Sequence, residues 1–274
     1  TYQLVKELRQ GRALFSQPPM PIKCAGAPQK AMYLSCDIWR DSGVLPAIDV
    51  EFHNAGAALF GVPTYVPALM EYVEKYGIDL RLESNLVAVD ADRRVATFER
   101  KQDGVSERIE REFDMLHVVP PQVSHAVVAN SPLAAASGFV EVDETTLRHK
   151  RFENIFGLGD AAGTSNAKTA AAARVQAPVV AVNALAALDG RPPVADYNGY
   201  GSCPLTVERG KIVLAEFGYG GKLLPSFPSW LLDGTRPTRT AWFLKERMLP
   251  PIYWQGMLKG REWMAAPHEI GKAA

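Results

Sequence analysis

The sequence predicts an α/β fold with a meander of extra strands. Residues 47–52 and 78–84 alternate apolar and polar side chains as short strands do, and residues 63–77 between them carry apolar side chains at helical spacing. Two further alternating runs, residues 86–91 and 94–100, follow without a helix between them. Strands joined through a helix pair in parallel, whereas strands joined directly pair in antiparallel fashion. We therefore expect both kinds of pairing in this part of the chain.

The bulk composition indicates a globular protein with a substantial core. Of 274 residues, 47% are hydrophobic and 22% are charged, which suits one large domain or two ordinary ones. Lys plus Arg and Asp plus Glu both number 30, so the charge balance gives no reason to expect nucleic acid as a partner. The three cysteines do not form the disulfide framework of a secreted protein and favour thiols with a chemical role. No metal site is predicted.

Three regions differ in pattern along the chain. Residues 1–115 hold the α/β pattern, and because they open without an initiator methionine in what looks like a helix, we expect a fragment. Residues 116–190 begin at a strand that two prolines stop, which indicates a crossing between domains. Residues 191–274 are rich in proline and are expected to form a separate small unit, with two strands paired around Gly210.

The middle region contains further predicted strands. Residues 138–143 and 146–152 alternate like a hairpin, and residues 155–158 read as a buried strand. A tight glycine turn and a long alanine-rich helix follow the buried strand.

Residues 230–264 combine aromatic and basic side chains. They hold four of the five tryptophans, and six basic residues stand against three acidic ones. Short helices of this composition suit the interface of an anionic membrane. A helical hairpin packed on the body of the protein or on a second subunit explains the pattern equally well. No uninterrupted apolar run reaches the roughly 18 residues that span a bilayer as a helix.

Two cysteines stand in unusual surroundings. Cys24, in PIKCAGAPQK, is expected between a strand and a helix N-terminus, where the helix dipole favours a thiolate. Cys203, in GYGSCPLTV, is expected in a constrained loop between glycines and a proline. Either thiol could instead be a buried structural residue. Cys36 falls inside the predicted helix after Cys24 and is interpreted as a packing residue.

The turn GLGDAAG, residues 157–163, suits a ligand with hydroxyl groups. Gly159 allows a close approach of the backbone, and the carboxylate of Asp160 can accept hydrogen bonds from a ribityl or ribose group. Lys168, at the start of the next helix, would favour negative charge such as that of a reduced flavin. Asp160 could also be a helix cap and Lys168 a solvated side chain. No G-x-G-x-x-G occurs in the chain, so the usual pyrophosphate cradle is not found in it.

Together these segments resemble the sulfide:quinone oxidoreductases, most closely the mitochondrial-type branch and its bacterial relatives. The resemblance covers nearly the whole chain and is carried by segments in the same order and at similar spacing: PIKCAGAPQKAMYLS, MLHVVPP, NIFGLGDAAG, AKTAAAA, YNGYGSCPLTVERGKIVLAEFGY and LP-x-x-YW. It implies an FAD/NAD(P)-binding fold with two Rossmann-like domains, as in glutathione reductase, incomplete at the N-terminus and followed by a membrane-interface region.

The resemblance also implies an activity. A cysteine pair would oxidise hydrogen sulfide by two electrons, with Cys24 on the flavin side and Cys203 on the sulfide side. FAD would pass the electrons to a ubiquinone-type quinone, and glutathione or polysulfide would take the sulfane sulfur. Asp160 corresponds to a ribityl contact, Lys168 to the lysine near the flavin edge, and Tyr253 and Trp254 to candidates for the quinone channel.

The same resemblance implies a peripheral protein of the bacterial inner or mitochondrial inner membrane, possible as an oligomer. Two other flavoprotein classes share the plan: type II NADH dehydrogenases and flavocytochrome sulfide dehydrogenases. A truncated remnant that binds membranes without flavin is the alternative that is not an enzyme.

Overall fold

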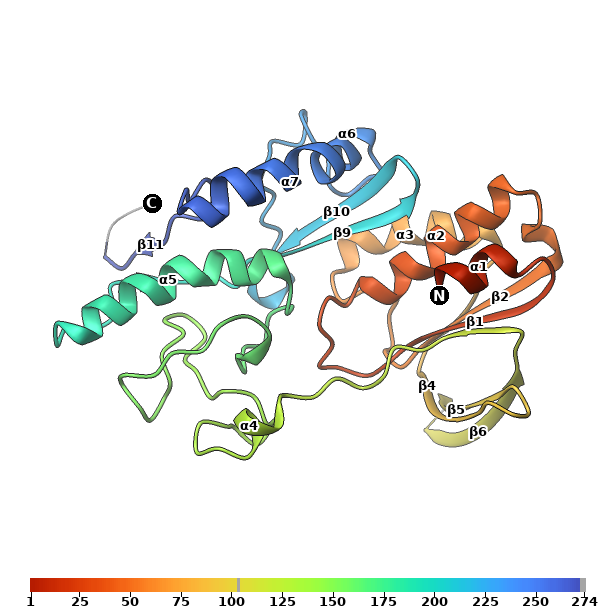
Figure 1. Ribbon diagram of the computed structural model, residues 1–274, viewed down its shortest axis with the longest axis horizontal. Coiled ribbons are helices and arrows are strands. Elements are labelled where there is room, and N and C mark those ends of the chain that lie inside the picture. Colours follow the sequence, from red (N-terminus) through yellow and green to blue (C-terminus); the bar gives the residue numbers. More distant parts are fainter. Residues whose placement is uncertain (103, 272–274) are drawn as a thin grey trace. The chain divides into compact units, whose positions relative to one another are not determined.

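Four parallel strands form the central sheet of the first part of the chain. Their order is β3-β2-β1-β7, with β1 at Gly11–Gln17, β2 at Ile48–Asn54, β3 at Asp79–Arg81 and β7 at Met115–His117 (Figure 1). The first pair runs in register from Gly11 opposite Ile48 to Gln17 opposite Asn54. Helices α2 (Ala27–Asp41) and α3 (Val66–Tyr76) make the crossovers. The predicted α/β fold is confirmed, because strand-helix-strand units in parallel order are the Rossmann arrangement.

The structure is a computed structural model that describes residues 1–102 and 104–271. The chain divides into two units. The first unit comprises Thr1–Gln122, Pro204–Val213 and Thr235–Trp242; the second comprises Val123–Cys203, Leu214–Gly234 and Phe243–Ala274.

The core of the first unit lies between the parallel sheet and its helices. Helix α2 begins with a proline in its first turn, and α3 ends at Gly77, whose φ of 65° allows the left-handed turn that terminates a helix. The indole of Trp39, on α2, is fully buried and donates a hydrogen bond of 2.8 Å to the carbonyl of Val5 in helix α1 (Tyr2–Glu7). Other fully buried side chains here are Leu14, Phe15, Met32, Tyr33, Phe52 and Leu69.

The predicted meander is an antiparallel sheet of three strands. It runs β4 (Ser84–Asp90), β5 (Val95–Gln102) and β6 (Val105–Glu112), the last of which the sequence did not predict. Ala96 and Phe98 on β5 pack against Leu14 of the parallel sheet. Strand β6 is mostly exposed and charged, which protects an edge strand from pairing with another chain.

A buried carboxylate ties the two sheets of this unit together. Glu51 on β2 is 4% exposed and accepts hydrogen bonds of 2.9 and 3.0 Å from the guanidinium of Arg111 on β6. Arg12 and Arg81 form ion pairs with it at 3.3 Å, and Nε2 of His53 lies at 3.0 Å. Burial alone would raise the pKa of Glu51, but these hydrogen bonds and positive charges outweigh it and lower the pKa to about 2.

The second unit is built around helix α5 (Ala170–Leu188). The Oγ1 of Thr169 caps the helix by accepting a hydrogen bond of 3.1 Å from the amide of Ala172. Val179 packs with Leu147, Ala195 and Tyr197. Helix α5 is 19 residues long with a mean hydropathy of 1.4, so it passes the length and composition test for a membrane span although a third of it is buried in the protein. A core helix of a soluble protein passes the same test.

The strands predicted at residues 138–143, 146–152 and 155–158 are wrong as ladder strands. Only isolated bridges occur there, such as Val142 with His149 and Arg148 with Phe156. The carboxylate of Asp143 accepts hydrogen bonds from the amides and hydroxyls of Thr145 and Thr146. This turn takes the backbone out of the extended conformation, which an alternating pattern does not reveal.

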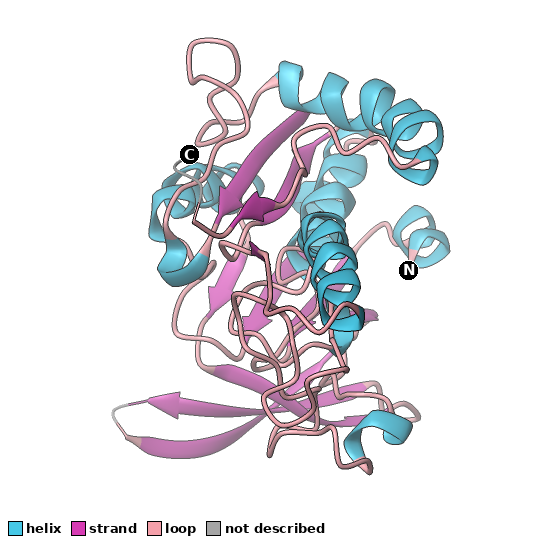
Figure 2. Cartoon of the chain, turned by 90° about the vertical axis from the view of Figure 1, so that its left-hand side faces the viewer, coloured by secondary structure: helices cyan, strands magenta, loops and turns pink. Residues whose placement is uncertain are grey.

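The two strands predicted around Gly210 are confirmed as a hairpin. Strands β9 (Gly201–Glu208) and β10 (Lys211–Phe217) meet at a turn in which Gly210 has a φ of 92° (Figures 1 and 2). The tip of the hairpin, residues 204–213, belongs to the first unit and its two ends belong to the second.

Helical turns occupy most of the basic, tryptophan-rich region. They are α6 (Arg239–Phe243), η5 (Leu244–Met248), α7 (Leu249–Pro251), η6 (Ile252–Gly256) and η7 (Met257–Lys259). The remaining elements are η1 (Leu45–Ala47), η2 (Pro63–Tyr65), α4 (Ala126–Ala129), η3 (Gly159–Ala161), η4 (Tyr219–Gly221) and the paired strands β8 (Ala195–Asp196) and β11 (His268–Glu269).

We predict that Glu51 makes the stability of the protein depend on acid pH. A lowered pKa stabilises the folded state above the ordinary value of 4.5, and this contribution disappears as the pH falls through about 2. It amounts to roughly 3 kcal/mol. Denaturant unfolding of the Glu51→Gln variant over a pH series should show lower stability at neutral pH and a flatter decline into acid.

The matched control is Glu110→Gln, which removes the same charge from an exposed ion pair with Arg93 at 3.5 Å. An exposed pair contributes little, so this variant should follow the wild type. An equal acid decline in Glu51→Gln and the wild type would contradict the role assigned to Glu51.

Candidate functional site

Cys24 lies in the turn that joins β1 to α2. The structure confirms the helix after it, but β1 ends at Gln17 and residues 18–26 form a connection, so the predicted strand directly before Cys24 is wrong. Cys24 has a φ of 56°, a left-handed conformation that residues with a side chain rarely adopt. Its carbonyl accepts a hydrogen bond of 2.7 Å from the amide of Ala27, the first residue of α2. Backbone strain of this kind concentrates at functional positions.

A lysine faces the sulfur of Cys24. The Nζ of Lys30, in the first turn of α2, lies 3.5 Å from the Sγ of Cys24, which is half-buried. Side chains on a helix lean toward its N-terminus, which directs Lys30 back to the turn. A nearby ammonium group stabilises a thiolate relative to the thiol. The arrangement therefore favours a nucleophilic sulfur.

The turn that carries Cys24 stands where a Rossmann unit holds its phosphate cradle. That cradle needs glycines, because the backbone must approach the pyrophosphate closely. Here the turn contains Pro18, Pro19 and Pro21, and it presents a thiol in their company. A proline has no amide hydrogen to donate, so this turn does not fit a dinucleotide pyrophosphate.

Cys203 is the third residue of β9, and the prediction that it sits in a loop is wrong. The side chain is fully buried. The constraint expected before it is present at Gly199, whose φ is 82° and where an added Cβ would come within 2.4 Å of the Tyr219 ring. Tyr200 further fixes this approach by donating a hydrogen bond of 2.6 Å to the buried carboxylate of Glu216. The segment before Cys203 is thus held rigidly within the second unit.

Cys36 lies within α2 and is completely buried, as expected of a packing residue. Burial, together with the neighbouring charge of Asp37, raises the pKa of this thiol far above its usual range. Such a thiol is chemically inert at neutral pH.

The GLGDAAG turn places Gly159 and Asp160 in the short helix η3. Gly159 has a φ of 62°, and its amide donates a hydrogen bond of 2.6 Å to Oε1 of Gln176 on α5. Asp160 is exposed, and it is Thr169 that caps α5, so the alternative of Asp160 as that cap is wrong. Among the described residues, none forms a hydrogen bond or ion pair with the Asp160 carboxylate. Its oxygens are therefore open to donors of a ligand.

Lys168 was expected at the start of the helix, but it lies one residue before Thr169, the cap of α5. Its side chain is buried, its ammonium donates to the carbonyl of Ala162, and it lies 4.6 Å from the centre of the Phe139 ring. A buried ammonium group near the GLGDAAG turn supplies positive charge beside the exposed Asp160 segment. The hydroxyl-accepting carboxylate, the left-handed glycine and the buried cation fit the ribityl and ring portions of a flavin.

Sequence reasoning missed Gln176 and Thr169, which hold the GLGDAAG turn and the start of α5. Nothing in the sequence distinguishes Gln176 from other polar residues on an alanine-rich helix. Thr169 could have been found, because a threonine directly before a helical run is a common cap. Among the described residues, no cluster of His, Cys, Asp and Glu could hold a metal ion.

The C-terminal helical turns expose many large apolar side chains. Tyr253 and Trp254 are 43% and 60% exposed, and their rings meet edge to face with centres 5.0 Å apart. We call the following residues the apolar patch: Phe243, Met248, Leu249, Tyr253, Trp254, Leu258, Trp263 and Met264, all more than a third exposed. Arg174 of α5 donates to the carbonyl of Trp263 and holds the end of the patch in place.

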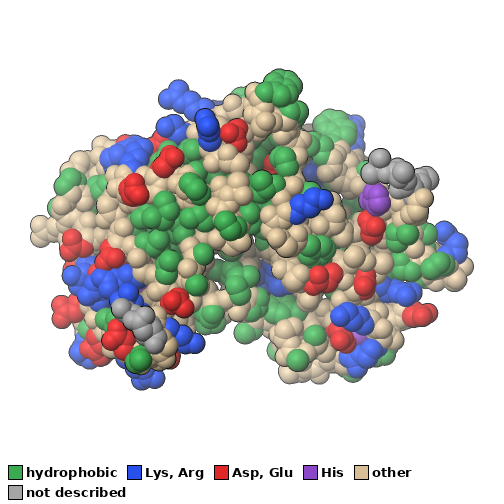
Figure 3. Space-filling view, turned by 180° about the vertical axis from the view of Figure 1, so that it is seen from behind, with side chains coloured by type: hydrophobic (Ala, Val, Ile, Leu, Met, Phe, Trp, Pro, Cys, Tyr) green, Lys and Arg blue, Asp and Glu red, His purple; other side chains and the backbone are tan. Residues whose placement is uncertain are grey.

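Exposed apolar residues also occur outside the patch. Figure 3 shows exposed hydrophobic side chains among Lys, Arg, Asp and Glu side chains on one face of the chain. Single exposed apolar residues are ordinary, whereas several of them along one short segment, as from Phe243 to Met264, favour a contact surface.

Comparison with known proteins identifies relatives over nearly the whole chain. No family model matches. The sulfide:quinone oxidoreductase, mitochondrial, of Dictyostelium discoideum is 40% identical over 263 residues, which are 95% of this chain and 57% of the relative. The protein of the same name from Schizosaccharomyces pombe is 40% identical over 266 residues, which are 96% of this chain and 58% of the relative.

Solved structures support the fold. The sulfide:quinone oxidoreductase of Aquifex aeolicus matches with a TM-score of 0.69 at 15% identity, over 98% of this chain and 65% of that one. A chain in the mitochondrial ATP synthase structure of Tetrahymena thermophila matches with a TM-score of 0.77 at 23% identity, over 94% of this chain and 62% of that one. The chain thus spans somewhat more than half the length of its curated relatives. The resemblance to the sulfide:quinone oxidoreductases that the motifs indicated is confirmed.

Proposed function

We propose that this chain carries the cysteine, flavin-contact and membrane-contact parts of a sulfide:quinone oxidoreductase. The observation that carries the proposal is Cys24, strained and facing Lys30, in the turn where a nucleotide-binding unit would hold phosphate. Relatives of that name at 40% identity support it.

The proposed reaction begins with Cys24 and Cys203 joined by a disulfide, directly or through a bridging sulfur. Sulfide attacks the sulfur of Cys203, a new S–S bond forms there, and the existing S–S bond of Cys203 breaks. Cys203 is left as a persulfide. Cys24 is left as a thiolate where the bond was direct, or as a persulfide anion where a sulfur bridged the two cysteines. Lys30, at 3.5 Å, stabilises the negative charge that Cys24 acquires as the leaving group.

The sulfane sulfur then leaves. A thiol such as glutathione, or a polysulfide, attacks the outer sulfur of the Cys203 persulfide and releases the Cys203 thiolate. Oxidation of the two cysteines back to the bonded pair releases two electrons, for which FAD, when bound, would be the acceptor on the way to quinone. Hydrogen sulfide, acceptor thiol and quinone thereby become a persulfide of the acceptor and the quinol, which balances atoms and electrons.

Three residues of this chain would contact the flavin. Asp160 would accept hydrogen bonds from the ribityl hydroxyls, and Gly159 would let the backbone approach them. The buried Lys168 would favour negative charge on the ring. The exposed Asp160 carboxylate and the positive φ of Gly159 support these roles.

The apolar patch would meet the membrane, as a peripheral protein of a mitochondrial or bacterial inner membrane requires. Quinone dissolves only in the bilayer, so an enzyme that reduces it must bring an apolar surface to that depth. The exposed rings of Tyr253 and Trp254 support a place for them at the quinone entrance.

An NADH dehydrogenase fits the observations less well. Such an enzyme needs a dinucleotide cradle, and the first strand-helix turn of the parallel sheet holds three prolines and Cys24 in its place.

The first prediction of this proposal concerns Cys203. In the whole flavoprotein, kept anaerobic, Cys203→Ser should slow bleaching of the flavin absorbance by sulfide more than about 10³-fold, because no electrophilic sulfur remains at that position. Cys36→Ala, which removes an inert thiol, should behave as the wild type. Normal bleaching in Cys203→Ser, or rapid bleaching of the wild type by NADH alone, would contradict the proposal.

A second prediction concerns the charge beside Cys24. In a Cys36→Ala, Cys203→Ser background Cys24 is the one cysteine of these 274 residues that can be alkylated. The rate at which iodoacetamide modifies the peptide that contains Cys24 reports the thiolate fraction. Lys30→Met should lower this rate about tenfold at neutral pH and move the pH profile upward, because the thiolate loses a stabilising charge. Lys23→Met, the same change next to Cys24, should have little effect. Equal rates in both variants would show that Lys30 does not activate Cys24.

The third prediction tests the apolar patch. The whole protein should sediment with vesicles that contain anionic lipid, and the pair Trp254→Glu and Leu258→Glu should reduce the bound fraction at least about tenfold, because charge cannot enter the hydrocarbon. Val127→Glu, at an apolar side chain 74% exposed on α4, is the control. Unchanged binding of the double variant would place the membrane contact elsewhere.

A further inference from the structure

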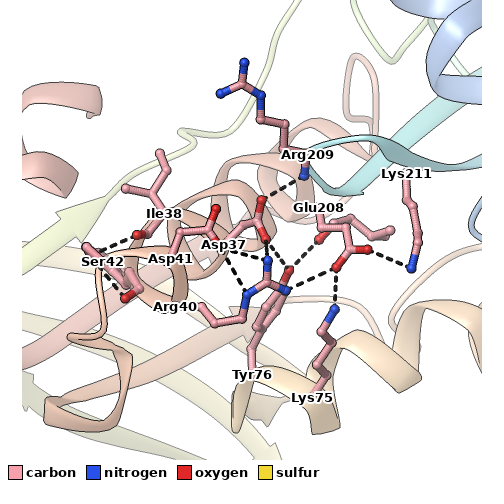
Figure 4. A network of polar contacts seen from close by, with 12 residues as sticks. Asp37, Ile38, Arg40, Asp41, Ser42, Lys75, Tyr76, Glu208, Arg209 and Lys211 are labelled. Carbon is pink, nitrogen blue, oxygen red and sulfur yellow. Dashed lines mark hydrogen bonds and ion pairs between the residues drawn. The ribbon is translucent and has the colours of Figure 1, made fainter. Parts of the chain in front are cut away.

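The tip of the β9–β10 hairpin is fastened by one buried carboxylate. The side chain of Glu208, the last residue of β9, is 9% exposed and lies among three cations (Figure 4). Arg40 of α2 contacts it at 3.2 Å, Lys211 of β10 contacts it at 2.8 Å, and Lys75 of α3 donates to it as well. A single residue therefore connects the hairpin to both helices of the parallel-sheet layer.

A second carboxylate extends the same network. Asp37, buried on α2, accepts a hydrogen bond of 2.8 Å from the backbone amide of Arg209 and forms an ion pair of 2.7 Å with Arg40. The hydroxyl of Tyr76 lies 3.2 Å from Asp37 and 3.1 Å from the carbonyl of Val207 (Figure 4). The network thus holds the hairpin by its backbone as well as by side chains. We call these contacts of Asp37, Tyr76 and Glu208 the hairpin anchor.

Glu208 of the hairpin anchor is charged throughout the physiological range. Burial alone would raise the pKa of Glu208, but the hydrogen bonds from Lys211, Lys75 and Arg40 outweigh it and lower the pKa to about 2. Removing the charge of Glu208 would leave three cations close together without their common partner. Their mutual repulsion would then loosen the contact that Glu208 now makes.

The two elements joined by the hairpin anchor are those that lead to the cysteines. Helix α2, with Asp37 and Arg40, begins three residues after Cys24, and Cys203 lies on β9 five residues before Glu208. Exchange between two sulfurs on separate segments depends on their effective concentration, which falls when either segment is mobile.

We propose that Glu208 and Asp37 are positioning residues for the chemistry of Cys203. They do not touch substrate. They attach β9, the strand that contains Cys203, to α2, the helix that follows Cys24. The inference rests on the proposed function, because it assumes that the two cysteines form one redox pair.

The redox equilibrium of the cysteine pair tests this inference. The whole flavoprotein in a Cys36→Ala background is equilibrated anaerobically with reduced and oxidised glutathione, and the fraction of Cys24–Cys203 disulfide is measured by alkylation and mass spectrometry. Two protein thiols lose two electrons as glutathione disulfide is reduced to two glutathione molecules. We expect Glu208→Gln to lower the equilibrium constant for disulfide formation about tenfold.

Two variants make the comparison specific. Glu110→Gln removes the same charge from an exposed pair on β6 and should leave the equilibrium unchanged. Tyr76→Phe removes only a hydroxyl from the hairpin anchor and should shift the equilibrium about threefold in the same direction. The flavin absorbance and the thermal midpoint would reveal whether Glu208→Gln prevents folding. In that case Tyr76→Phe still tests the inference.

The outcomes separate this inference from the proposed function. A wild-type protein in which Cys24 and Cys203 form no disulfide at any glutathione ratio would overturn the proposed function and this inference with it. A wild-type pair that forms, with an equal constant in Tyr76→Phe and in folded Glu208→Gln, would overturn the positioning role alone. A fall in both variants, with Glu110→Gln unchanged, would support it.

Discussion

The first unit depends on the neutralisation of one buried charge, that of Glu51. A carboxylate inside a parallel sheet is unfavourable unless cations and hydrogen-bond donors surround it. Arg12 of β1, Arg81 of β3 and Arg111 of β6 supply them, so strands of both sheets converge on one side chain. Arg12 lies on β1, so its ion pair with Glu51 also holds β1 in the sheet. The carboxyl end of β1 leads into the turn that carries Cys24. These ion pairs therefore help to fix the position from which that turn begins.

Much of the first unit could be predicted from the sequence, and less of the second. Alternating and helical periods predicted β2, α3, β4 and β5, because their apolar residues recur at the spacing of a strand or of a helix. The same reading gave false strands at residues 138–158, where the Asp143 turn diverts the backbone and side-chain hydrogen bonds replace a ladder. The site divided in the same way. Cys24 could be predicted from the local sequence. The hydrogen bond of Gly159 to Gln176 and the ion pairs of Glu208 with α2 and α3 could not, because they join residues far apart in the chain.

Replacing a phosphate cradle by a thiol turn changes what a Rossmann unit can do. Glycines in that turn free the backbone for an anion, whereas prolines stiffen it and remove amide donors. What remains at the carboxyl end of β1 is a fixed position next to a helix N-terminus. Under the proposed function, a cysteine there, with Lys30 at 3.5 Å, would use for a thiolate the positive environment that other Rossmann units use for phosphate. The helix N-terminus thus supplies positive charge, and the residues of the turn determine whether a phosphate or a thiolate is placed beside it.

The carboxylate of Glu208 and the thiolate proposed for Cys24 need different surroundings. Glu208 is held by three cations, and its pKa of about 2 makes it a permanent structural charge. A thiolate in the same surroundings would be a poor nucleophile, because sulfur loses reactivity as its proton affinity falls. Cys24 is half-buried with Lys30 beside it, which favours the thiolate while leaving its electrons available. In the proposed reaction Cys24 is the leaving group, and an intermediate degree of stabilisation would suit a sulfur that must also be oxidised again. The carboxylate of Glu208 has no part in that reaction and can be held as tightly as the fold allows.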